Sequence, residues 1–235
     1  MACRLHSSPM LVIIVPFRSL NQPERLRQLT IFLNHMRQKI PAAYIFIMEQ
    51  ADNRLFNRGA LLNAGVDVAG ISDHDIVCFH DIDLLPMDDI IDDYLIPLAQ
   101  GTVRHIAAAW KRYDSKSYFG GILMMHKGDF MRVNGFPNNF WGWGGEDDEL
   151  RDRISRHALT IEKSKGTILD LENLTLGQKL ETLKKTKQKC MNKWETRRWH
   201  KENPSVDGIR SQKYSILHTH QMLDKNTFYY QIQIH

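Results

Sequence analysis

Three short apolar segments separated by two helical patterns constrain the fold of this chain most strongly. Residues 10–16, 44–48 and 76–79 are apolar and rich in β-branched side chains, which is typical of strands buried on both faces. Between them, residues 24–37 and 59–68 repeat apolar side chains every three or four positions, as an amphipathic helix does. The alternation predicts an α/β fold with a mostly parallel, Rossmann-like sheet covered by helices on both faces. Ligands of such sheets bind beyond the carboxyl ends of the strands.

The second half of the chain has a less regular pattern. Residues 104–109 and 121–126 predict strands, and 127–133 predict a short helix that ends at Asn134-Gly135. Residues 146–157 predict a helix with four acids in its first turn, where the helix dipole favours negative charge. The last predicted elements are strands over 213–219 and 227–234. No linker or repeat divides the sequence, so residues 1–235 are expected to form a single domain.

The composition excludes several classes of protein. With 43% hydrophobic and 25% charged residues among 235, disordered, collagen-like and coiled-coil chains are excluded. The longest apolar run is interrupted by Pro16 and is too short to span a membrane. It also lacks a signal-peptide cleavage site. Cys3, Cys78 and Cys190 are too widely spaced to predict a disulfide framework or a zinc site, so a reducing, cytoplasmic setting is expected.

The positive charge of the chain is concentrated in one segment. The formal net charge is +4, yet residues 179–201 alone carry nine Lys or Arg against two Glu. Such a segment could attract phosphates or nucleic acid. A solvated helix face is the simpler interpretation, and no nucleic-acid partner is expected.

Two aspartates follow the third predicted strand. Asp81 and Asp83 are two positions apart, so in extended chain their carboxylates point the same way. Such a pair suits a hard divalent cation, which could neutralise a diphosphate leaving group. A pair of surface acids at a strand end is the alternative.

A glycine- and tryptophan-rich loop leads into the acidic helix. Trp141 to Asp148 read Trp-Gly-Trp-Gly-Gly-Glu-Asp-Asp. Tryptophan offers a flat apolar face to a sugar ring, carboxylates accept hydrogen bonds from hydroxyls, and one acid could act as a general base. The alternative is a loop whose tryptophans fill the core, but this does not explain the three glycines.

At this point the sequence resembles a known family, the β-1,4-galactosyltransferases. The similarity covers residues 10 to about 160, in the order of that family's motifs. The matching segments are Pro16-Phe17-Arg18, Phe56-Asn57-Arg58, Asp81-Ile82-Asp83, Tyr118-Phe119-Gly120-Gly121, Asn134 to Asn139, and Trp141 to Asp148.

The resemblance implies a GT-A fold and inverting transfer of a sugar from a UDP-sugar, usually UDP-galactose, with Mn²⁺ as cofactor and a glycan as acceptor. Residues 10–110 would bind the nucleotide sugar and 111–235 the acceptor. Carried over residue by residue, the uridine and diphosphate side would be held by Pro16, Phe17, Arg18, Phe56 and Arg58. Asp83 would bind the metal with Asp81 beside it, Tyr118 and Gly121 would lie near the donor sugar, and Trp143 would close over the substrates. Gly145, Glu146, Asp147 and Asp148 would contact the acceptor, with Asp147 as the catalytic base.

The sequence also departs from the family pattern. Family members complete the metal site with His, or with Met and His, about 25 to 30 residues after the acidic motif. Here Asp170 and Glu172 occupy roughly that place and could serve as oxygen ligands, while His218 and His220 lie later in the chain. Golgi members carry an amino-terminal anchor that is not recognisable here, so the chain is either truncated or from a bacterial or viral setting.

Two other functions remain as hypotheses. The same fold could use UDP-GalNAc, UDP-GlcNAc or UDP-glucose as donor. A non-catalytic module could instead bind sugars through the tryptophan loop, or nucleic acid through residues 179–201.

Overall fold

The computed structural model describes residues 8–20, 22–113, 118–204 and 206–235. Its strands are β1 (Leu11–Phe17), β2 (Tyr44–Gln50), β3 (Ile76–His80), β4 (Leu84–Pro86), β5 (Thr102–His105), β6 (Ile122–His126), β7 (Thr160–Lys163), β8 (Ile168–Asp170), β9 (Tyr214–Gln221) and β10 (Thr227–Ile234). Its α-helices are α1 (Pro23–Lys39), α2 (Arg58–Ala69), α3 (Asp92–Leu95), α4 (Lys127–Arg132), α5 (Glu146–Arg156), α6 (Leu176–Lys185) and α7 (Lys193–Glu202).

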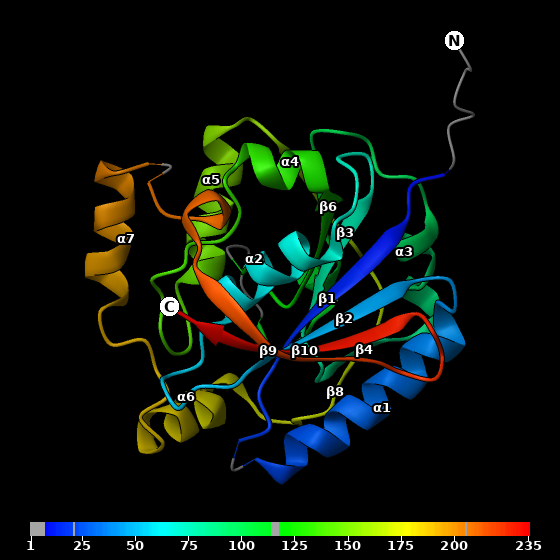
Figure 1. Cartoon of the computed structure of the whole chain (residues 1–235), viewed down its shortest axis with the longest axis horizontal. Coiled ribbons are helices and arrows are strands. Elements are labelled where there is room, and N and C mark those ends of the chain that lie inside the picture. Colours follow the sequence, from blue (N-terminus) through cyan, green and yellow to red (C-terminus); the bar gives the residue numbers. More distant parts are fainter. Residues whose placement is uncertain (1–7, 21, 114–117, 205) are drawn as a thin grey trace.

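One mixed sheet forms the centre of the molecule, in the order β7-β5-β6-β3-β1-β2-β10-β9 (Figure 1). The pairs β1–β2, β1–β3, β2–β10 and β5–β7 are parallel. β6 runs antiparallel to β3 and β5, and β9 antiparallel to β10. The expected mostly parallel sheet is therefore corrected to a mixed one. The chain reaches β6 from a loop beside the carboxyl end of β3, so β6 must run in the opposite direction.

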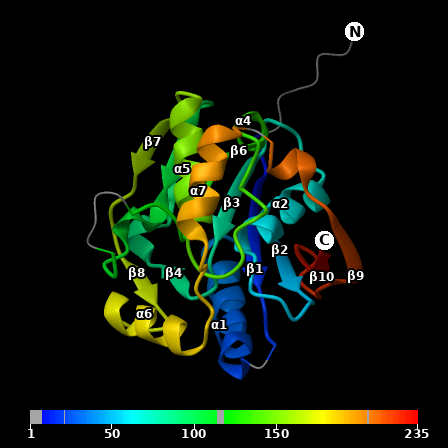
Figure 2. The ribbon, with the colours of Figure 1, turned by 90° about the vertical axis from the view of Figure 1, so that its left-hand side faces the viewer.

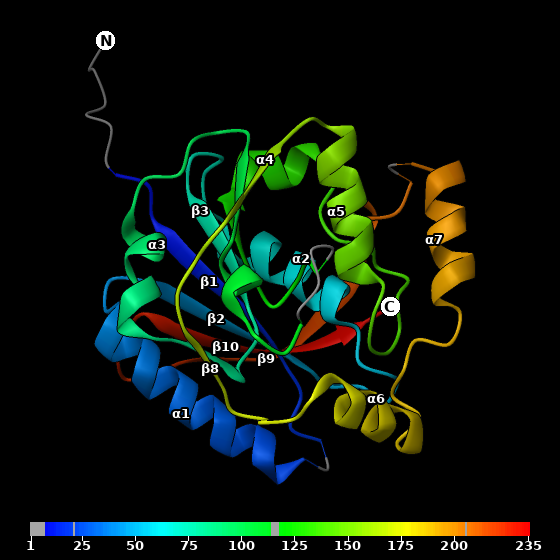
Figure 3. The same cartoon turned by 180° about the vertical axis from the view of Figure 1, so that it is seen from behind.

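Helices cover both faces of this sheet, as predicted. One core packs α1 and α3 against side chains such as Ile13, Val15 and Ile45, and Figure 3 shows α1 lying along that face. The second core packs α2, α4 and α5 against the alternate side chains of the same strands, such as Ile14 and Phe46. Because successive side chains of a strand point to opposite faces, nearly every residue of β1, β2 and β3 is buried, which explains the continuous apolar runs.

The sequence predictions of individual elements hold in the first half and need correction later. Residues 104–109 form the short strand β5 followed by a 3-10 turn over Ile106–Ala109. The basic segment forms α6 and α7, and Figure 2 shows α7 beside α5. β4 and β8 make a separate two-stranded sheet that the sequence did not suggest. In the described ranges, every helix is too short or too polar to cross a membrane.

Cys78 and Cys190 are buried free thiols, which agrees with the absence of a predicted disulfide between them. Cys3 lies outside the described residues. The division of the chain into a donor half and an acceptor half stays a prediction.

Candidate active site

The predicted functional segments meet at the carboxyl ends of β1, β2 and β3, the edge where an α/β sheet binds its ligands. Arg18 follows β1, and Asp81 and Asp83 follow β3. Helix α2 begins at Arg58 after β2, and α5 begins at Glu146. Segments that are far apart in sequence thus contribute side chains to one place.

Arg58 is the centre of this cluster. Its Nε donates to Asp81 at 2.8 Å, and its Nη1 donates to Asp147 at 2.8 Å and lies 3.8 Å from Glu146. The side chain is only 11% exposed. One buried guanidinium therefore holds the strand-end aspartate and the helix-start acids together, and these carboxylates keep the pKa of Arg58 above its usual value despite burial.

The start of α2 explains why an asparagine precedes Arg58. The Asn57 side chain caps the helix by accepting from Ala60 N at 3.0 Å, and it donates to Asn138 O at 2.7 Å. Gln50 at the end of β2 accepts from Asn57 N at 2.8 Å. The Phe-Asn-Arg segment is thereby attached both to the sheet and to the Asn-Gly-Phe-Pro-Asn-Asn loop, which orients Arg58.

Asp147 lies in the first turn of α5, close to the backbone of Gly120. A Cβ atom at Gly120 would lie 2.4 Å from Asp147 Oδ2, so only glycine leaves room for the carboxylate there. Burial raises the pKa of Asp147 well above its usual value, and Arg58 opposes this only in part. A carboxylate with a raised pKa is a stronger base, which suits proton abstraction near neutral pH.

The two strand-end aspartates differ in their electrostatic surroundings. Burial raises the pKa of Asp81, although Arg58 acts against it. Burial also disfavours the charged form of Asp83, but Arg25, 3.4 Å away, and then Lys179 outweigh it and hold its pKa below the usual value. Asp83 is thus the carboxylate of the pair that is anionic under all ordinary conditions.

Arg18 and Phe56 lie together, and their contact with the nucleotide stays a prediction. The Arg18 guanidinium is 5.4 Å from the centre of the Phe56 ring and donates to Gln188 Oε1 at 3.0 Å. Pro16 and Phe17, in contrast, are buried in the sheet core, so they shape this region from beneath rather than presenting side chains to a ligand.

Tyr118 and Gly121 line the cluster from the loop before β6. The Tyr118 ring stacks on Tyr113 with centres 4.3 Å apart. Gly121 has φ +71° and its carbonyl accepts from Asp81 N at 3.2 Å. This positions Tyr118 next to the Arg58 carboxylates, whose charges contribute to the high pKa of its buried phenol.

The tryptophan loop is attached to the segment between α6 and α7. Trp143 N donates to Gln188 O at 2.8 Å, and Cys190 N donates to Trp143 O at 3.1 Å. The Trp143 side chain remains 36% exposed. Gly145 supports the loop, because a Cβ atom there would lie 2.3 Å from Phe140. A lid role for Trp143 stays a prediction.

The acids of α5 do not all face the cluster. Glu146 does, and its Oε2 is buried without a hydrogen-bond partner among the described residues. Asp148 instead contacts Lys193 of α7 at 2.7 Å. Its side chain points away from Arg58, because successive residues of a helix point about 100° apart, and its contact with substrate stays a prediction.

The candidate third metal ligands are not assembled. His218 and His220 lie on β9, four strands from β3, or about 19 Å at the usual strand spacing. Asp170 and Glu172 are closer, but both contact Arg112. In the described part of the chain, no three His, Cys, Asp or Glu side chains gather as metal ligands. These residues therefore do not fit a divalent cation held by Asp83 and two further side chains.

Sequence reasoning missed three cations of this region, namely Arg25, Arg112 and Lys179. Each of them acts on Asp83 electrostatically. No local pattern marks an isolated basic residue as part of a site. Only the resemblance pointed to the neighbouring positions Asp170 and Glu172.

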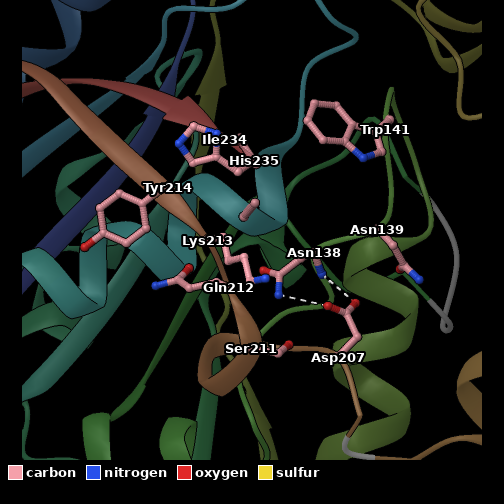
Figure 4. Close-up of a pocket in the computed structure, with 11 residues that line it drawn as sticks. Asn138, Asn139, Trp141, Asp207, Ser211, Gln212, Lys213, Tyr214, Ile234 and His235 are labelled. Atoms are coloured by element: carbon pink, nitrogen blue, oxygen red, sulfur yellow. Dashed lines mark hydrogen bonds between the residues drawn. The ribbon is translucent and has the colours of Figure 1, made fainter.

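A hollow of about 240 Å³ lies apart from the Arg58 cluster (Figure 4). Its walls include Asn138, Trp141, Asp207 and Tyr214. Asn138 donates hydrogen bonds to the Asp207 carboxylate from both its backbone N–H and its side-chain amide. The hollow contains none of the acids that surround Arg58, so it is not the centre of the predicted chemistry.

Comparisons with known proteins agree with the geometry. Residues 2–94 match the family described as the N-terminal region of glycosyl transferase group 7, and residues 102–176 match the N-terminal domain of galactosyltransferase. The xylosylprotein 4-beta-galactosyltransferase of Caenorhabditis elegans is 32% identical over 223 residues, which is 91% of this chain and 73% of that one. Human beta-1,4-galactosyltransferase 1 is 31% identical over 87% of this chain and 50% of its own. The chain thus spans about half the length of that relative.

A solved structure matches nearly the whole chain. A mutant of Drosophila beta-1,4-galactosyltransferase 7, in complex with manganese, UDP-Gal and xylobiose, superposes with a TM-score of 0.76 at 30% identity. The match covers 97% of this chain and 94% of that one. It confirms the predicted GT-A fold.

Proposed function

Because this chain belongs to the β-1,4-galactosyltransferase family, we propose that it transfers galactose from UDP-galactose to a sugar hydroxyl with inversion at the anomeric carbon. The structural observation that carries the proposal is the contact of Arg58 with both Asp81 and Asp147. It brings the carboxylate that follows β3 close to a second carboxylate, of raised pKa, at the start of α5. An inverting transfer needs such an arrangement, with the donor on one side and a base on the other.

In the proposed reaction, Asp147 accepts the proton of the acceptor hydroxyl. The acceptor oxygen forms a bond to the anomeric carbon while the bond from that carbon to the diphosphate oxygen breaks. UDP leaves with the electron pair, and attack from the face opposite to UDP inverts the configuration. Burial of Asp147 favours the step, since it raises the basicity of the carboxylate.

Positive side chains would stabilise the departing UDP. Arg18 lies beside Phe56 at the end of β1, and guanidinium groups form charge-assisted hydrogen bonds with phosphate oxygens. Arg58 has a second role, because it fixes the base relative to the donor-side aspartate. Asp81 and Asp147 would otherwise repel each other at short range.

The cofactors expected from the family are those of the Drosophila complex, which contains manganese and UDP-Gal. Where a family member binds manganese, the ion supplies a positive charge that stabilises a diphosphate leaving group. In this chain Asp81, Asp170 and Glu172 each contact a cation of the protein, and Asp83 lies 3.4 Å from Arg25, so no step is assigned to the ion here.

The acceptor that we propose is a β-linked xylose. The Caenorhabditis relative is named for a xylosylprotein acceptor, and the Drosophila complex contains xylobiose. Trp143 is exposed on the loop that leads into α5, and the flat apolar face of a tryptophan is suited to a sugar ring.

The decisive experiment incubates the protein with each of UDP-galactose, UDP-GalNAc, UDP-GlcNAc and UDP-glucose, with xylobiose as acceptor and Mn²⁺ present. We expect a β-linked galactosyl product from UDP-galactose, identified by its anomeric coupling constant in NMR. Transfer from another donor would correct the sugar but keep the reaction. Saccharide binding without turnover or UDP affinity would instead support a non-catalytic lectin.

A further inference from the structure

Arg112 is enclosed by the two acids that stand at the place of the family's completing metal ligands. Its Nη2 lies 2.5 Å from Asp170 Oδ2, and its Nη1 donates to Glu172 Oε2 at 2.8 Å. Lys179 of α6 lies 2.5 Å from Glu172 Oε1. The carboxylates of Asp170 and Glu172 are thus engaged by cations of the protein.

The remaining oxygen of Asp170 is engaged as well. Its Oδ1 accepts from Glu172 N at 2.9 Å, while Trp110 Nε1 donates to Oδ2 at 3.2 Å. All four oxygens of the two acids therefore have a donor within the chain. A metal ion could bind them only by displacing these groups.

Arg112 is also held in place from the side. Its guanidinium lies over the Trp110 ring at 4.5 Å, and its side chain is 3% exposed. The buried Nε has no hydrogen-bond partner among the described residues. Since an unpaired buried guanidinium nitrogen is costly, this atom is a donor left for a ligand.

The guanidinium borders an open space. A hollow of about 380 Å³ is lined by Trp110, Arg112, Asp170 and residues 173–176. Leu171 N donates to Asp83 O at 2.8 Å, which brings the segment that carries Asp170 and Glu172 against the aspartate motif. Arg112 and Lys179 both favour the ionised form of Asp83.

The charges in this part of the site balance without an added ion. Asp83, Asp170 and Glu172 are matched by Arg25, Arg112 and Lys179. A divalent cation could bind these carboxylates only by displacing the paired cations, whereas the Arg112 guanidinium keeps an unpaired Nε donor for a phosphate oxygen.

We propose that Arg112 binds the diphosphate of the UDP-sugar donor, held in place by Asp170 and Glu172 and assisted by Lys179. This inference rests on the proposed function. Arg112 would thus take over part of the role that the completing metal ligands have in the family. Guanidinium groups match phosphate geometry better than ammonium groups do, and a clamped guanidinium loses little freedom on binding.

The test measures UDP affinity by calorimetry in excess EDTA and in Mn²⁺. We expect the wild-type protein to bind UDP in EDTA, and Arg112→Gln to weaken that binding at least tenfold, about the effect of one charge-assisted contact. Lys179→Gln should weaken it several-fold. The matched control is Lys185→Gln on the same helix, whose lysine is 73% exposed and pairs with Glu181 one turn away; it should bind UDP like the wild type.

A second variant guards against misfolding. If circular dichroism shows that Arg112→Gln is unfolded, Arg112→Lys is tested instead. It keeps the positive charge but loses the planar guanidinium group, and it should bind UDP three- to tenfold more weakly than the wild type. Unchanged UDP affinity in the folded variant would overturn the inference. So would a gain in Mn²⁺ affinity of Arg112→Gln, measured by electron paramagnetic resonance, since Arg112 would then merely fill a metal site.

The wild-type protein itself separates this inference from the proposed function. UDP binding that requires Mn²⁺ would overturn the role of Arg112 and leave the galactosyltransferase proposal standing. Failure to bind UDP in either buffer would overturn both.

Discussion

Arg58 and Asp147 are 89 positions apart in the sequence and form a hydrogen bond of 2.8 Å between the first turns of α2 and α5. Because the same guanidinium also binds Asp81, the end of β3 and the start of α5 are linked through one side chain. This link allows the roles of the individual acids to be separated by mutation.

Asp147→Asn should abolish turnover while preserving the site. The amide is isosteric but cannot accept the acceptor's proton, so kcat should fall about 10²- to 10⁴-fold, the usual contribution of a general base. UDP affinity should stay within about threefold. Both are measured on the same preparation by a transfer assay and calorimetry.

The adjacent residue provides the control for this experiment. Asp148 contacts Lys193 on α7 rather than Arg58, so Asp148→Asn should leave kcat within a few-fold of the wild type. Equal losses in the two variants would mean that the helix start, rather than the Asp147 carboxylate, is required.

The pH dependence of transfer should report the raised pKa of Asp147. A base must be deprotonated to act, so kcat/KM should decline on acidification at a pH well above the value near 3.9 that an ordinary aspartate shows. The burial of Asp147 is the cause. An acidic limb that stays below pH 4.5 would contradict the assignment.

The stability of the fold should change with pH in the opposite direction from the rate of transfer. The folded state holds the Asp147 proton more tightly than the unfolded chain does, so this group destabilises the fold as pH rises through its raised pKa. Asp147→Asn should therefore melt at a higher temperature than the wild type near pH 8, and the gap should close toward pH 4. Thermal scans across that pH range measure the difference.

Much of the fold was predictable because its central strands are buried on both faces. β1, β2 and β3 have largely apolar sequences that few other environments tolerate, and α1 buries one face. α2, in contrast, is buried on all sides over residues 59–66. The direction of β6 was not predictable, because strand polarity depends on where the preceding loop returns. The β4–β8 pair involves three-residue strands that carry too little pattern to detect.

The residues of the site also fall into a group that the sequence predicts and a group that it does not. Asp81, Arg58 and Asp147 lie within motifs of unusual composition, and the structure brings them into contact. Arg112 and Lys179 have ordinary neighbours in the sequence, and their importance arises only from tertiary pairing with Asp170 and Glu172. The sequence favours a solvated face for the basic segment 179–201, yet Lys193 and Arg197 bind acids of α5 and Lys179 binds an acid that follows β8.

Replacement of Arg58 should reveal the electrostatic cost of the cluster. Arg58→Gln leaves Asp81, Glu146 and Asp147 without their shared counter-charge. We expect the free energy of unfolding to fall by about 2–3 kcal/mol. This is at the low end for a broken buried ion pair, because the two aspartate side chains are about a quarter exposed. Urea titration at pH 7.5 measures it.

A second substitution tests whether repulsion causes that loss. Adding Asp147→Asn to Arg58→Gln removes one of the repelling charges, so it should restore part of the stability without restoring transfer. If the double variant is less stable than Arg58→Gln alone, the loss comes from packing of the arginine rather than from charge.

Gly65 sets the distance between the helix that carries Arg58 and the sheet that carries the aspartates. A Cβ atom at this position of α2 would lie 2.3 Å from Ile14 Cγ2 on β1, so Gly65→Ala must push the helix outward. Overpacking of this kind costs about 1–3 kcal/mol, and it should also lower kcat because Arg58 would move away from Asp81.

Gly177 on α6 is the matched control, since nothing lies within 4 Å of its Cβ position. Gly177→Ala should stabilise the protein by about 0.5–1 kcal/mol through helix propensity and leave transfer unchanged. Urea titration and the transfer assay test both variants, and a Gly65→Ala protein with wild-type stability and rate would show that the site does not depend on this helix-to-strand spacing.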